Sequence, residues 1–357
     1  MQPLKLNRIQ DFRLPMAVLG AALTPEADLL VTGCMDGVYL SDMQSGESRR
    51  VAERSSYVSG VAWLQNSQQF VSAGYDGKLH WFDRVTESIS REQQVHQFWS
   101  WDMALSPDQR MIASVTGQYL AGGYRYEPQP EREPSVVLLD AQTGTRLFEL
   151  PHVPSVQAVC FSSDNHYVAA GNLMGEVRIW DCHTGELQAN WNTEDFTSWG
   201  IIKSHSYLGG IFAMQFTPNG EQLILAGMGP MRDPMAGNGK QLWQKWNWRA
   251  EEPNKAAEIN KGEAGEGLME ALAVHPTRPV FAMGGRLRGG DWNVALFHLD
   301  TGERLTTLKT GYRVTGIEFT DDGNRMLVTG TQGQPKPNKE RQWEPFGRVE
   351  LYEIIPG

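Results

Sequence analysis

Cysteine, long apolar runs and positive charge are all scarce in this sequence of 357 residues. The three cysteines lie far apart and form neither a disulfide framework nor a metal-ligand spacing, which is typical of a reducing compartment. No uncharged apolar stretch reaches the roughly 18 residues of a membrane-spanning helix. With 32 Lys and Arg against 42 Asp and Glu, the net charge of −10 argues against nucleic acid or an anionic membrane as the main partner.

The residue spacings that mark common catalytic and metal sites are also missing. The eight histidines are dispersed, and none belongs to an HExxH or similar ligand pattern. No GxSxG elbow, CxxC pair or Walker sequence is present. The glycine-rich segment GMGPMRDPMAGNGK lacks the spacing of a phosphate-binding loop, and its Arg232–Asp233 pair is interpreted as a contact that shapes a turn-rich loop. The sequence therefore predicts no enzyme activity, no metal and no cofactor.

Glycine and tryptophan are abundant, with 37 and 12 residues, and they accompany a repeat. One pattern recurs seven times: a short apolar strand, a polar or Pro-containing turn, and a second strand, as in AVCFSSDNHYVAAG and GIEFTDDGNRMLVTG. The turns recur every 40 to 58 residues, and the shorter intervals match a four-stranded propeller blade of about 40–45 residues. The equivalent turn positions are Pro25, Gln65, Pro107, Ser163, Pro218, Pro276 and Asp321.

The first strand of each repeat is apolar on one face and small on the other, so we expect both faces to be buried. In the fourth repeat, Val159 and Phe161 share one face, and the small residues Ala158 and Cys160 share the other. Small side chains suit strands that converge on a crowded central axis. Polar exceptions need hydrogen-bond partners or water, and these exceptions are Asp102, Gln215 and Glu318.

A third strand ends in an acidic residue followed by a Gly-containing turn, as in GEVRIWDCHTGE and GVYLSDMQSGE. Such a turn closes a strand pair, because Gly supplies the positive φ angle that the turn needs. His298 and Glu353 take the place of the aspartate in the last two repeats. The aspartates at the matched position of the first four repeats are Asp42, Asp83, Asp140 and Asp181.

With its Trp180–Asp181 pair, the fourth repeat resembles the WD-repeat family of β-propellers, and the seven aligned units extend this resemblance over the whole chain. The other repeats carry degenerate pairs, and the family's Gly-His dipeptide is missing, with Pro151–His152 the nearest equivalent. We therefore expect the family's buried hydrogen-bond network of His, Ser or Thr, Asp and Trp to be incomplete in every blade.

The resemblance implies an all-β fold, a single domain over residues 1–357 that forms a seven-bladed β-propeller of four-stranded antiparallel blades. The last repeat supplies only three strands, and the N-terminal segment LKLNRIQDF is predicted to be its fourth, closing the ring. We expect residues 4–11 to pair with residues 347–354. The blades are expected near residues 17–55, 56–95, 96–152, 153–195, 208–262, 268–311 and 312–357, with residues 1–12 as the closing strand.

Residues 14–23 (LPMAVLGAAL) follow three basic residues and resemble the apolar core of a short signal peptide. Such a signal would place the protein in the periplasm or outside the cell. Asp11 and Pro15 interrupt the pattern, and the same residues fit the first repeat. A cytoplasmic location is therefore the favoured interpretation.

Five insertions lengthen the repeats, at residues 118–134, 190–207, 230–239, 285–291 and 332–346. By the geometry that the resemblance implies, second-to-third and fourth-to-first strand connections emerge on one face of the disc, so all five crowd together there. Insertions on one face often mark a binding face, and Tyr, Trp and Arg are enriched at interface hot spots. The residues expected to contact a partner are Tyr57, Trp99, Trp101, Tyr119, Tyr124, Arg125, Tyr126, Trp199, Arg232, Asp233, Arg286, Arg288, Trp292, Arg313 and Trp343.

These features predict a non-catalytic scaffold that binds another protein or a peptide through this face, with no nucleic acid or membrane partner and with a monomer favoured. Aromatic residues of long loops also pack on one another, so self-packed loops are the alternative reading of the same residues. The rival hypothesis is a propeller hydrolase or small-ligand-binding protein that uses the mouth of the central channel, through Asp102, Glu318, Trp99 and Trp101. It predicts a deep polar pocket with at least two convergent carboxylates.

Overall fold

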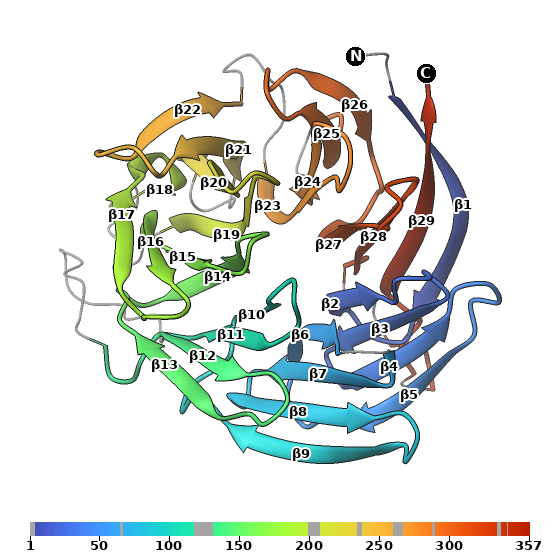
Figure 1. The fold of residues 1–357 in the computed structure, drawn as a ribbon. Coiled ribbons are helices and arrows are strands. Elements are labelled where there is room, and N and C mark those ends of the chain that lie inside the picture. Colours follow the sequence, from blue (N-terminus) through green and yellow to red (C-terminus); the bar gives the residue numbers. More distant parts are fainter. Residues whose placement is uncertain are drawn as a thin grey trace.

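The computed structural model describes residues 4–64, 67–117, 131–198, 208–233, 238–259, 267–287, 290–333, 337–340 and 342–357. They form seven antiparallel sheets arranged in a ring, with consecutive sheets side by side (Figure 1). Each sheet has four strands, except that the fifth also includes the two-residue strand β18 (Thr197–Ser198). The predicted all-β, seven-bladed propeller is confirmed.

The first strand of each blade lies nearest the centre of the ring, and the fourth lies at its rim (Figure 1). Blades 1 and 2 consist of β2 (Val18–Leu23), β3 (Leu29–Cys34), β4 (Gly37–Asp42) and β5 (Ser48–Glu53), then β6 (Val58–Trp63), β7 (Gln69–Gly74), β8 (Lys78–Asp83) and β9 (Ser88–Gln94). Blades 3 and 4 consist of β10 (Asp102–Leu105), β11 (Met111–Val115), β12 (Val136–Asp140) and β13 (Arg146–Leu150), then β14 (Val156–Phe161), β15 (Tyr167–Asn172), β16 (Glu176–Asp181) and β17 (Leu187–Asn192).

A short 3-10 helix, η2 (Glu194–Phe196), precedes β18 and leads into blade 5. Blade 5 continues with β19 (Leu208–Phe216), β20 (Leu223–Asp233), β21 (Asn238–Asn247) and β22 (Asn254–Glu258). Blade 6 consists of β23 (Gly267–Val274), β24 (Val280–Leu287), β25 (Val294–His298) and β26 (Arg304–Leu308). Blade 7 combines β27 (Arg313–Phe319), β28 (Arg325–Thr331) and β29 (Gly347–Pro356) with β1 (Leu4–Leu14) from the other end of the chain.

The ring closes where the two ends of the chain meet, and both termini lie together in Figure 1. β1 pairs antiparallel with β29, from Leu4 opposite Pro356 to Leu14 opposite Gly347. The predicted pairing of the N-terminal segment with the last blade is confirmed, and it continues three residues beyond Asp11. Leu14, at the start of the apolar run that resembled a signal peptide, is completely buried in the core.

An aspartate carboxylate organises the turn after the third strand. In blade 4, the carboxylate of Asp181 accepts hydrogen bonds from the backbone amides of His183 at 2.7 Å and Thr184 at 2.9 Å. Gly185 then adopts a φ of +73°, which glycine tolerates without steric cost. Blade 6 has His298 at this position, and its Nδ1 atom accepts the equivalent bonds from the amides two and three residues further on, at 3.2 and 3.3 Å.

We expect Asp181→Ala to lower the free energy of unfolding by about 1 kcal/mol, because two turn amides lose their acceptor while water still reaches them. His298→Asp is the matched variant and should stay within about 0.5 kcal/mol of the natural protein, since aspartate makes the same bonds in blades 1 to 4. Chemical denaturation measures both changes. A larger loss for His298→Asp than for Asp181→Ala would contradict this account of the turn.

Close packing at the axis explains the small residues of the first strands. A Cβ atom added to Gly20 of blade 1 would stand 2.9 Å from the Cα atom of Gly60 in blade 2, closer than real Cβ contacts. Further from the axis, large side chains fill the space between blades. The indole of Trp81 is 2% exposed and donates its Nε1 hydrogen to the carbonyl oxygen of Ala141 in the next blade at 2.7 Å.

Two insertions that were predicted as loops are partly strand, and this corrects the sequence-based boundaries. β20 continues to Asp233 and pairs with β21, so the insertion at 230–239 extends a hairpin. β24 likewise runs to Leu287, which places Arg286 on a strand, not in a loop at 285–291. In both cases the chain continues an existing ladder, which satisfies backbone groups that a loop would leave to water.

The three cysteines are free and buried. Within the described ranges, no helix has the length and apolar character needed to cross a membrane. In the same ranges, no three His, Cys, Asp or Glu side chains gather as a set of metal ligands.

Candidate binding site at the mouth of the ring

Two kinds of connection meet at one end of the ring. Tyr57 lies in the fourth-to-first strand link that enters blade 2, and Tyr75 lies in the second-to-third strand turn of the same blade. Their ring centroids are 5.6 Å apart, so both connections emerge on the same face, as predicted. We call this end of the ring, where these two kinds of connection surround the axis, the mouth.

A backbone irregularity recurs where the first strand of a blade leaves the mouth. In six blades the pairing of the first and second strands slips by one residue, as between Val58 and Gly60 in blade 2. Such a β-bulge bends the strand and re-aims the side chain of the extra residue. The extra residues are Leu19, Ser59, Gln157, Phe212, Glu270 and Thr315, and Trp101 holds the corresponding place in blade 3.

Five aromatic side chains from blades 2 and 3, which we call the aromatic cluster, pack together at the mouth. Tyr75 and Trp99 stack with centroids 4.7 Å apart and planes inclined by 4°. Phe98 stacks on Trp99 at 5.1 Å, and Trp101 meets Trp99 edge-on at 5.1 Å. Tyr57 and Trp99 are still 42% and 41% exposed although their rings are held by neighbours. The cluster therefore presents a rigid aromatic surface to solvent.

Three basic side chains from blades 6 and 7, which we call the basic cluster, line the other side of the mouth. Arg313 forms a two-point ion pair with Glu270, in which Nε lies 2.6 Å from Oε2. Burial raises the pKa of Glu270, and Arg313 opposes that shift by stabilising the carboxylate. Lys309 donates from Nζ to the carbonyl oxygen of Gly290 at 3.0 Å. Arg286 is exposed and makes no ion pair with any residue that the structure describes.

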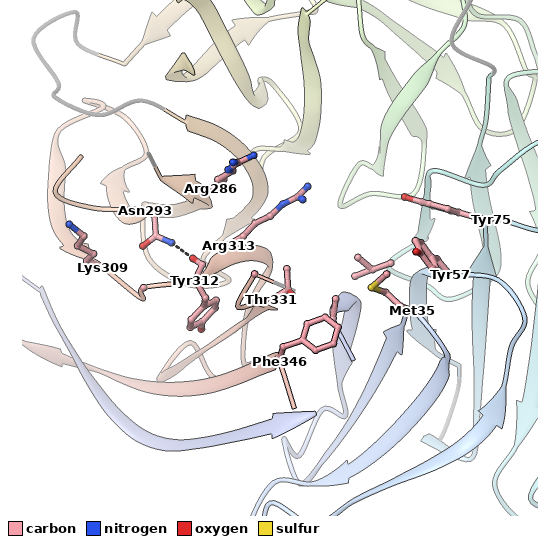
Figure 2. Close-up of a pocket in the computed structure, with 14 residues that line it drawn as sticks. Met35, Tyr57, Tyr75, Arg286, Asn293, Lys309, Tyr312, Arg313, Thr331 and Phe346 are labelled. Carbon is pink, nitrogen blue, oxygen red and sulfur yellow. Dashed lines mark hydrogen bonds between the residues drawn. The ribbon is translucent and has the colours of Figure 1, made fainter. Parts of the chain in front are cut away.

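A pocket of about 740 Å³ separates the two clusters, and we call it the mouth pocket. Figure 2 shows Arg286 and Arg313 reaching towards the side from which Met35, Tyr57 and Tyr75 project. Among its described lining residues, three are basic and none is acidic. A volume within the roughly 300–1,000 Å³ of ligand-binding pockets, together with an aromatic wall and convergent donors, marks this as a binding site.

The structure brings five of the predicted contact residues together at the mouth: Tyr57, Trp99, Trp101, Arg286 and Arg313. A sixth, Trp343, is 42% exposed in the connection between β28 and β29. That connection also contributes Gly333 and Phe346 to the lining of the mouth pocket.

The remaining predicted contact residues are either buried or outside the described part of the structure. Trp292 is 2% exposed and meets Phe297 edge-on at 6.2 Å in the core of blades 5 and 6, so its assignment to a partner surface is corrected. Its large apolar ring gains more from burial in this core than from exposure. The side chains of Arg232 and Asp233 lie outside the described part of the structure, and so do Tyr119, Tyr124, Arg125, Tyr126, Trp199 and Arg288.

Sequence reasoning missed other residues of the mouth, namely Met35, Tyr75, Phe98 and Lys309. Met35 and Tyr75 lie in short second-to-third strand turns, whereas the sequence-based prediction rested on the long insertions. Their position in the repeat could have identified them, because every turn between a second and a third strand emerges at the mouth whatever its length.

Polar side chains of the first strands join neighbouring blades below the mouth. Glu318 accepts the backbone N–H of Leu23 through Oε2 at 3.1 Å, across the junction between blades 7 and 1. Gln215 makes the equivalent bond to Val274 at 2.8 Å, between blades 5 and 6. These bonds confirm that the polar exceptions in the first strands find hydrogen-bond partners.

Asp102 is the third polar exception. Its carboxylate accepts the backbone N–H of Val159 in blade 4 at 3.0 Å and that of Met103 at 2.8 Å. Burial raises the pKa of Asp102 to about 6 and that of Glu318 to about 8. The two carboxyl groups belong to separate blades and each is bound to backbone amides, so they do not form the convergent pair that the hydrolase hypothesis requires.

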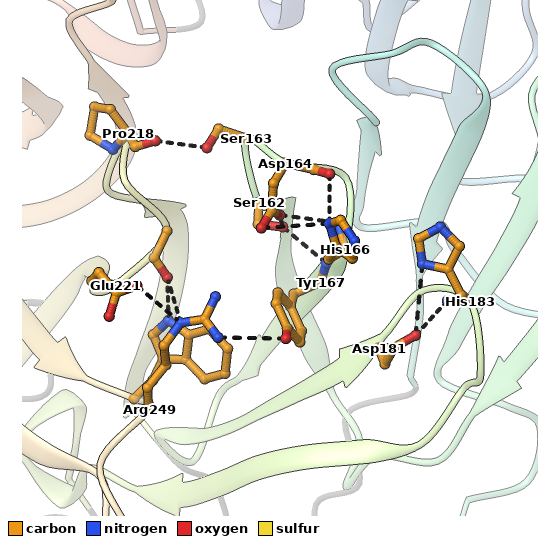
Figure 3. A network of polar contacts seen from close by, with 12 residues as sticks. Ser162, Ser163, Asp164, His166, Tyr167, Asp181, His183, Pro218, Glu221 and Arg249 are labelled. Carbon is orange, nitrogen blue, oxygen red and sulfur yellow. Dashed lines mark hydrogen bonds and ion pairs between the residues drawn. The ribbon is translucent and has the colours of Figure 1, made fainter.

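The opposite face of the ring carries a network of short polar contacts between blades 4 and 5 (Figure 3). Ser163 donates from Oγ to the carbonyl oxygen of Pro218 at 2.8 Å, and the guanidinium of Arg249 lies 4.4 Å from the Trp248 ring. His166 is exposed and bonds to the backbone of its own turn, as expected for a structural histidine. These side chains join two blades, and that role accounts for their placement.

The family described as WD domain, G-beta repeat matches residues 47–83 and 144–181 of this chain. The matched segments end at Asp83 and Asp181, the turn aspartates of blades 2 and 4. This match and the closed ring of seven sheets agree with each other. The chain is a seven-bladed propeller that contains WD40 repeats. Propellers of this family typically act as scaffolds for interactions between proteins.

Individual relatives of this WD40 propeller are distant. Telomerase protein component 1 of Rattus norvegicus is 26% identical over 183 residues, which are 50% of this chain and 6% of the rat protein. Target of rapamycin complex subunit wat1 of Schizosaccharomyces pombe is 26% identical over 132 residues, or 36% of this chain and 37% of that protein. Telomerase Cajal body protein 1 of Homo sapiens is 25% identical over 170 residues, or 46% of this chain and 26% of the human protein. The matches thus cover much less than two thirds of each relative.

This WD40 propeller replaces parts of the family's buried hydrogen-bond network. In blade 2, Arg54 is 7% exposed and donates to the carboxylate of Asp76 at 2.7 Å and to Ser72 at 3.5 Å. In blade 3, Nε2 of His96 lies 2.9 Å from the hydroxyl of Ser114, and burial lowers the pKa of His96 to about 3. A buried arginine ion pair in blade 2 and a neutral histidine in blade 3 thus each hold the segment before the first strand against the rest of the blade.

Proposed function

We propose that this WD40 propeller is a non-catalytic scaffold that binds a segment of another protein, or a peptide, at the mouth, and that it does so as a monomer. The mouth pocket carries the proposal, because it joins an exposed aromatic wall to basic donors at the centre of one face. A few residues supply most of the binding energy at protein interfaces, and Trp, Tyr and Arg are enriched among them. The name of the Schizosaccharomyces pombe relative describes a complex subunit, which supports a protein partner for this chain.

The rigidity of the aromatic cluster favours binding. Tyr57 and Trp99 are exposed, yet each ring already packs against a neighbour at 5.6 Å or less. An immobilised side chain loses little conformational entropy when a partner covers it, at a saving of about 0.5–1.5 kcal/mol for each one. Pre-organised aromatic anchors of this kind are suited to holding a short segment.

The ion pairing at the mouth argues against hydrolysis there. Glu270 is the acidic side chain that the described bulges direct to the mouth, and both of its carboxylate oxygens are bound by Arg313. A general acid or base must exchange its proton with a substrate, and the guanidinium occupies the positions where that exchange would occur. The arrangement supports recognition over bond cleavage.

The double variant Tyr57→Ser/Trp343→Ser is expected to lose at least about 90% of the partner captured from a native lysate. It removes one exposed ring from the mouth pocket and another from the connection between β28 and β29, without opening a cavity. Quantitative mass spectrometry of tagged protein, natural and variant, measures the loss. A photo-crosslinking residue placed at position 57 identifies the segment in contact.

Val85→Ser is the matched control for the double variant. Val85 is 76% exposed in the turn between β8 and β9, at the end of the ring opposite the mouth. It should capture the same partners as the natural protein. Partners that survive in Tyr57→Ser/Trp343→Ser but disappear in Val85→Ser would place the binding face on the other side and refute the proposal.

A further inference from the structure

We infer that the partner segment is acidic and that it runs from the mouth pocket outward over blade 7. The inference rests on the proposed function and adds the chemistry of the partner. The chain has a net charge of −10, yet the described lining of the mouth pocket has three basic residues and no acidic one. Glu270 behind the lining offsets the charge of Arg313, so the excess positive charge is carried by Arg286 and Lys309. A basic site on an otherwise acidic protein attracts a negatively charged partner to that site.

A second basic pair continues the positive strip on blade 7. Arg13 of β1 stands directly opposite Arg348 of β29 in the ladder, where like charges destabilise a sheet. Neither arginine makes an ion pair with a described residue. Arg348 is half-buried, and its burial and the charge of Arg13 both lower its pKa. An anionic group placed between the two guanidinium groups relieves this repulsion.

The nearby carboxylate is already bound by other groups. Glu350 is 7% exposed and accepts hydrogen bonds from the hydroxyls of Tyr312 at 3.0 Å and Tyr352 at 2.5 Å. It also pairs with Arg8 at 2.9 Å. Asp11, the other acid in this hollow, lies 3.9 Å from Arg8. The acidic groups of the hollow are thus directed to Arg8 and the two tyrosines, and the Arg13–Arg348 pair keeps its donors for an outside ligand.

The two basic regions are connected by hollows along the surface. A hollow of about 250 Å³ contains both Arg13 and Arg348, and it shares Gly311 and Tyr312 with the mouth pocket. A third hollow borders Arg13 and shares Gly333 and Phe346 with the mouth pocket, and Glu344 also lines it. An extended segment can therefore place an apolar or aromatic residue against the aromatic cluster and acidic residues along the strip. Carboxylates and phosphorylated side chains share the chemistry that arginine recognises with paired N–H donors.

Short fluorescent peptides test the inference on the full chain. Each carries one central Trp, flanked by Glu, by phosphoserine, by Gln or by Lys, and binding is followed by fluorescence anisotropy. At low salt we expect the Glu or phosphoserine peptide to bind at least about tenfold more tightly than the Gln and Lys peptides, and this preference should shrink at high salt because exposed charges are screened. The comparison of Glu with phosphoserine identifies which anion is preferred.

Charge-reversal variants locate the strip. Arg286→Glu and Arg348→Glu should each weaken binding of the preferred acidic peptide about tenfold. Lys5→Glu is the matched control: Lys5 is exposed on the same strand as Arg13 but at its far end, and its reversal should change affinity less than about twofold. Equal affinity for the Gln and acidic peptides, or equal effects of Lys5→Glu and Arg348→Glu, would overturn the inference.

The outcomes separate this inference from the proposed function. Peptides that bind without regard to charge, and lose affinity in Tyr57→Ser/Trp343→Ser, would leave the scaffold in place and remove the acidic segment. If Tyr57→Ser/Trp343→Ser weakened the binding of no peptide, the mouth would not be the binding site, and both would fail.

Discussion

A chain that lacks residues 1–12 is expected to unfold at least about 10 °C below the full chain, or not to fold stably at all. The truncation removes nearly all of β1, which pairs with β29 from Leu4 to Leu14 and closes the ring. It also removes Leu4, which is 7% exposed in the core of blades 6 and 7. The unpaired edge of β29 would then be open to association with other chains. Differential scanning calorimetry and light scattering measure the two effects.

Addition of the missing strand in trans is the control for this truncation. A synthetic peptide of residues 4–14 should raise the unfolding temperature of the truncated chain with increasing peptide concentration, because it binds the folded ring and not the unfolded chain. A scrambled peptide of the same composition should have no effect. An unchanged unfolding temperature after truncation would show that the closing strand contributes little to the ring.

Glu318→Ala is expected to reduce the free energy of unfolding by about 2–4 kcal/mol. Glu318 accepts a hydrogen bond from the backbone amide of Leu23 at 3.1 Å, where blade 7 meets blade 1. Shortening the side chain to alanine therefore leaves a buried N–H without an acceptor and a void near the axis. Glu318→Gln is the matched variant, because Gln215 makes the equivalent bond between blades 5 and 6 at 2.8 Å. It should keep most of the stability at about pH 6. Similar losses for both variants in urea unfolding would contradict a role for the hydrogen bond.

The same substitution predicts a pH dependence. Burial raises the pKa of Glu318 from 4.5 to about 8, so between these values the folded protein holds a proton that the unfolded chain releases. The stabilisation from Glu318 is therefore complete below pH 4.5 and is lost as the pH rises through about 8. Glutamine has no proton to lose, so the stability of Glu318→Gln relative to the natural protein should increase between about pH 5 and 9. A difference that is constant over this range would mean that Glu318 titrates normally.

The architecture was predictable because each blade repeats a local pattern. Alternating apolar residues, small residues at the axis and an acidic residue before a Gly turn are all visible within one repeat, and Asp181 with Gly185 behaves as such a turn requires. Ring closure was predictable for a related reason, since the last repeat has one strand too few. The length of the hairpins was not predictable, because an insertion that prolongs a strand pair has no distinct local sequence pattern. The continuation of β24 through Arg286 is an example.

The mouth was predicted in part. Tyr57, Trp99 and Arg313 come just before first strands or at their start, and that position alone placed them near the axis. The environment of each side chain depended on other blades, as with Glu270, which lies in blade 6 and pairs with Arg313 of blade 7. Trp292 shows the limit most clearly, because an aromatic residue beside an insertion can face the core or solvent with the same local sequence.

Periodic patterns within single chain segments are enough to predict the number of blades, the closing strand, the turn chemistry and the polar positions of the first strands. The folded ring was needed to show which side chains share the mouth pocket, which acids are already paired with a base, and that Arg13 stands opposite Arg348. Those properties arise where residues from distant segments converge, and the free energy of such contacts depends on distance and burial that no single repeat encodes.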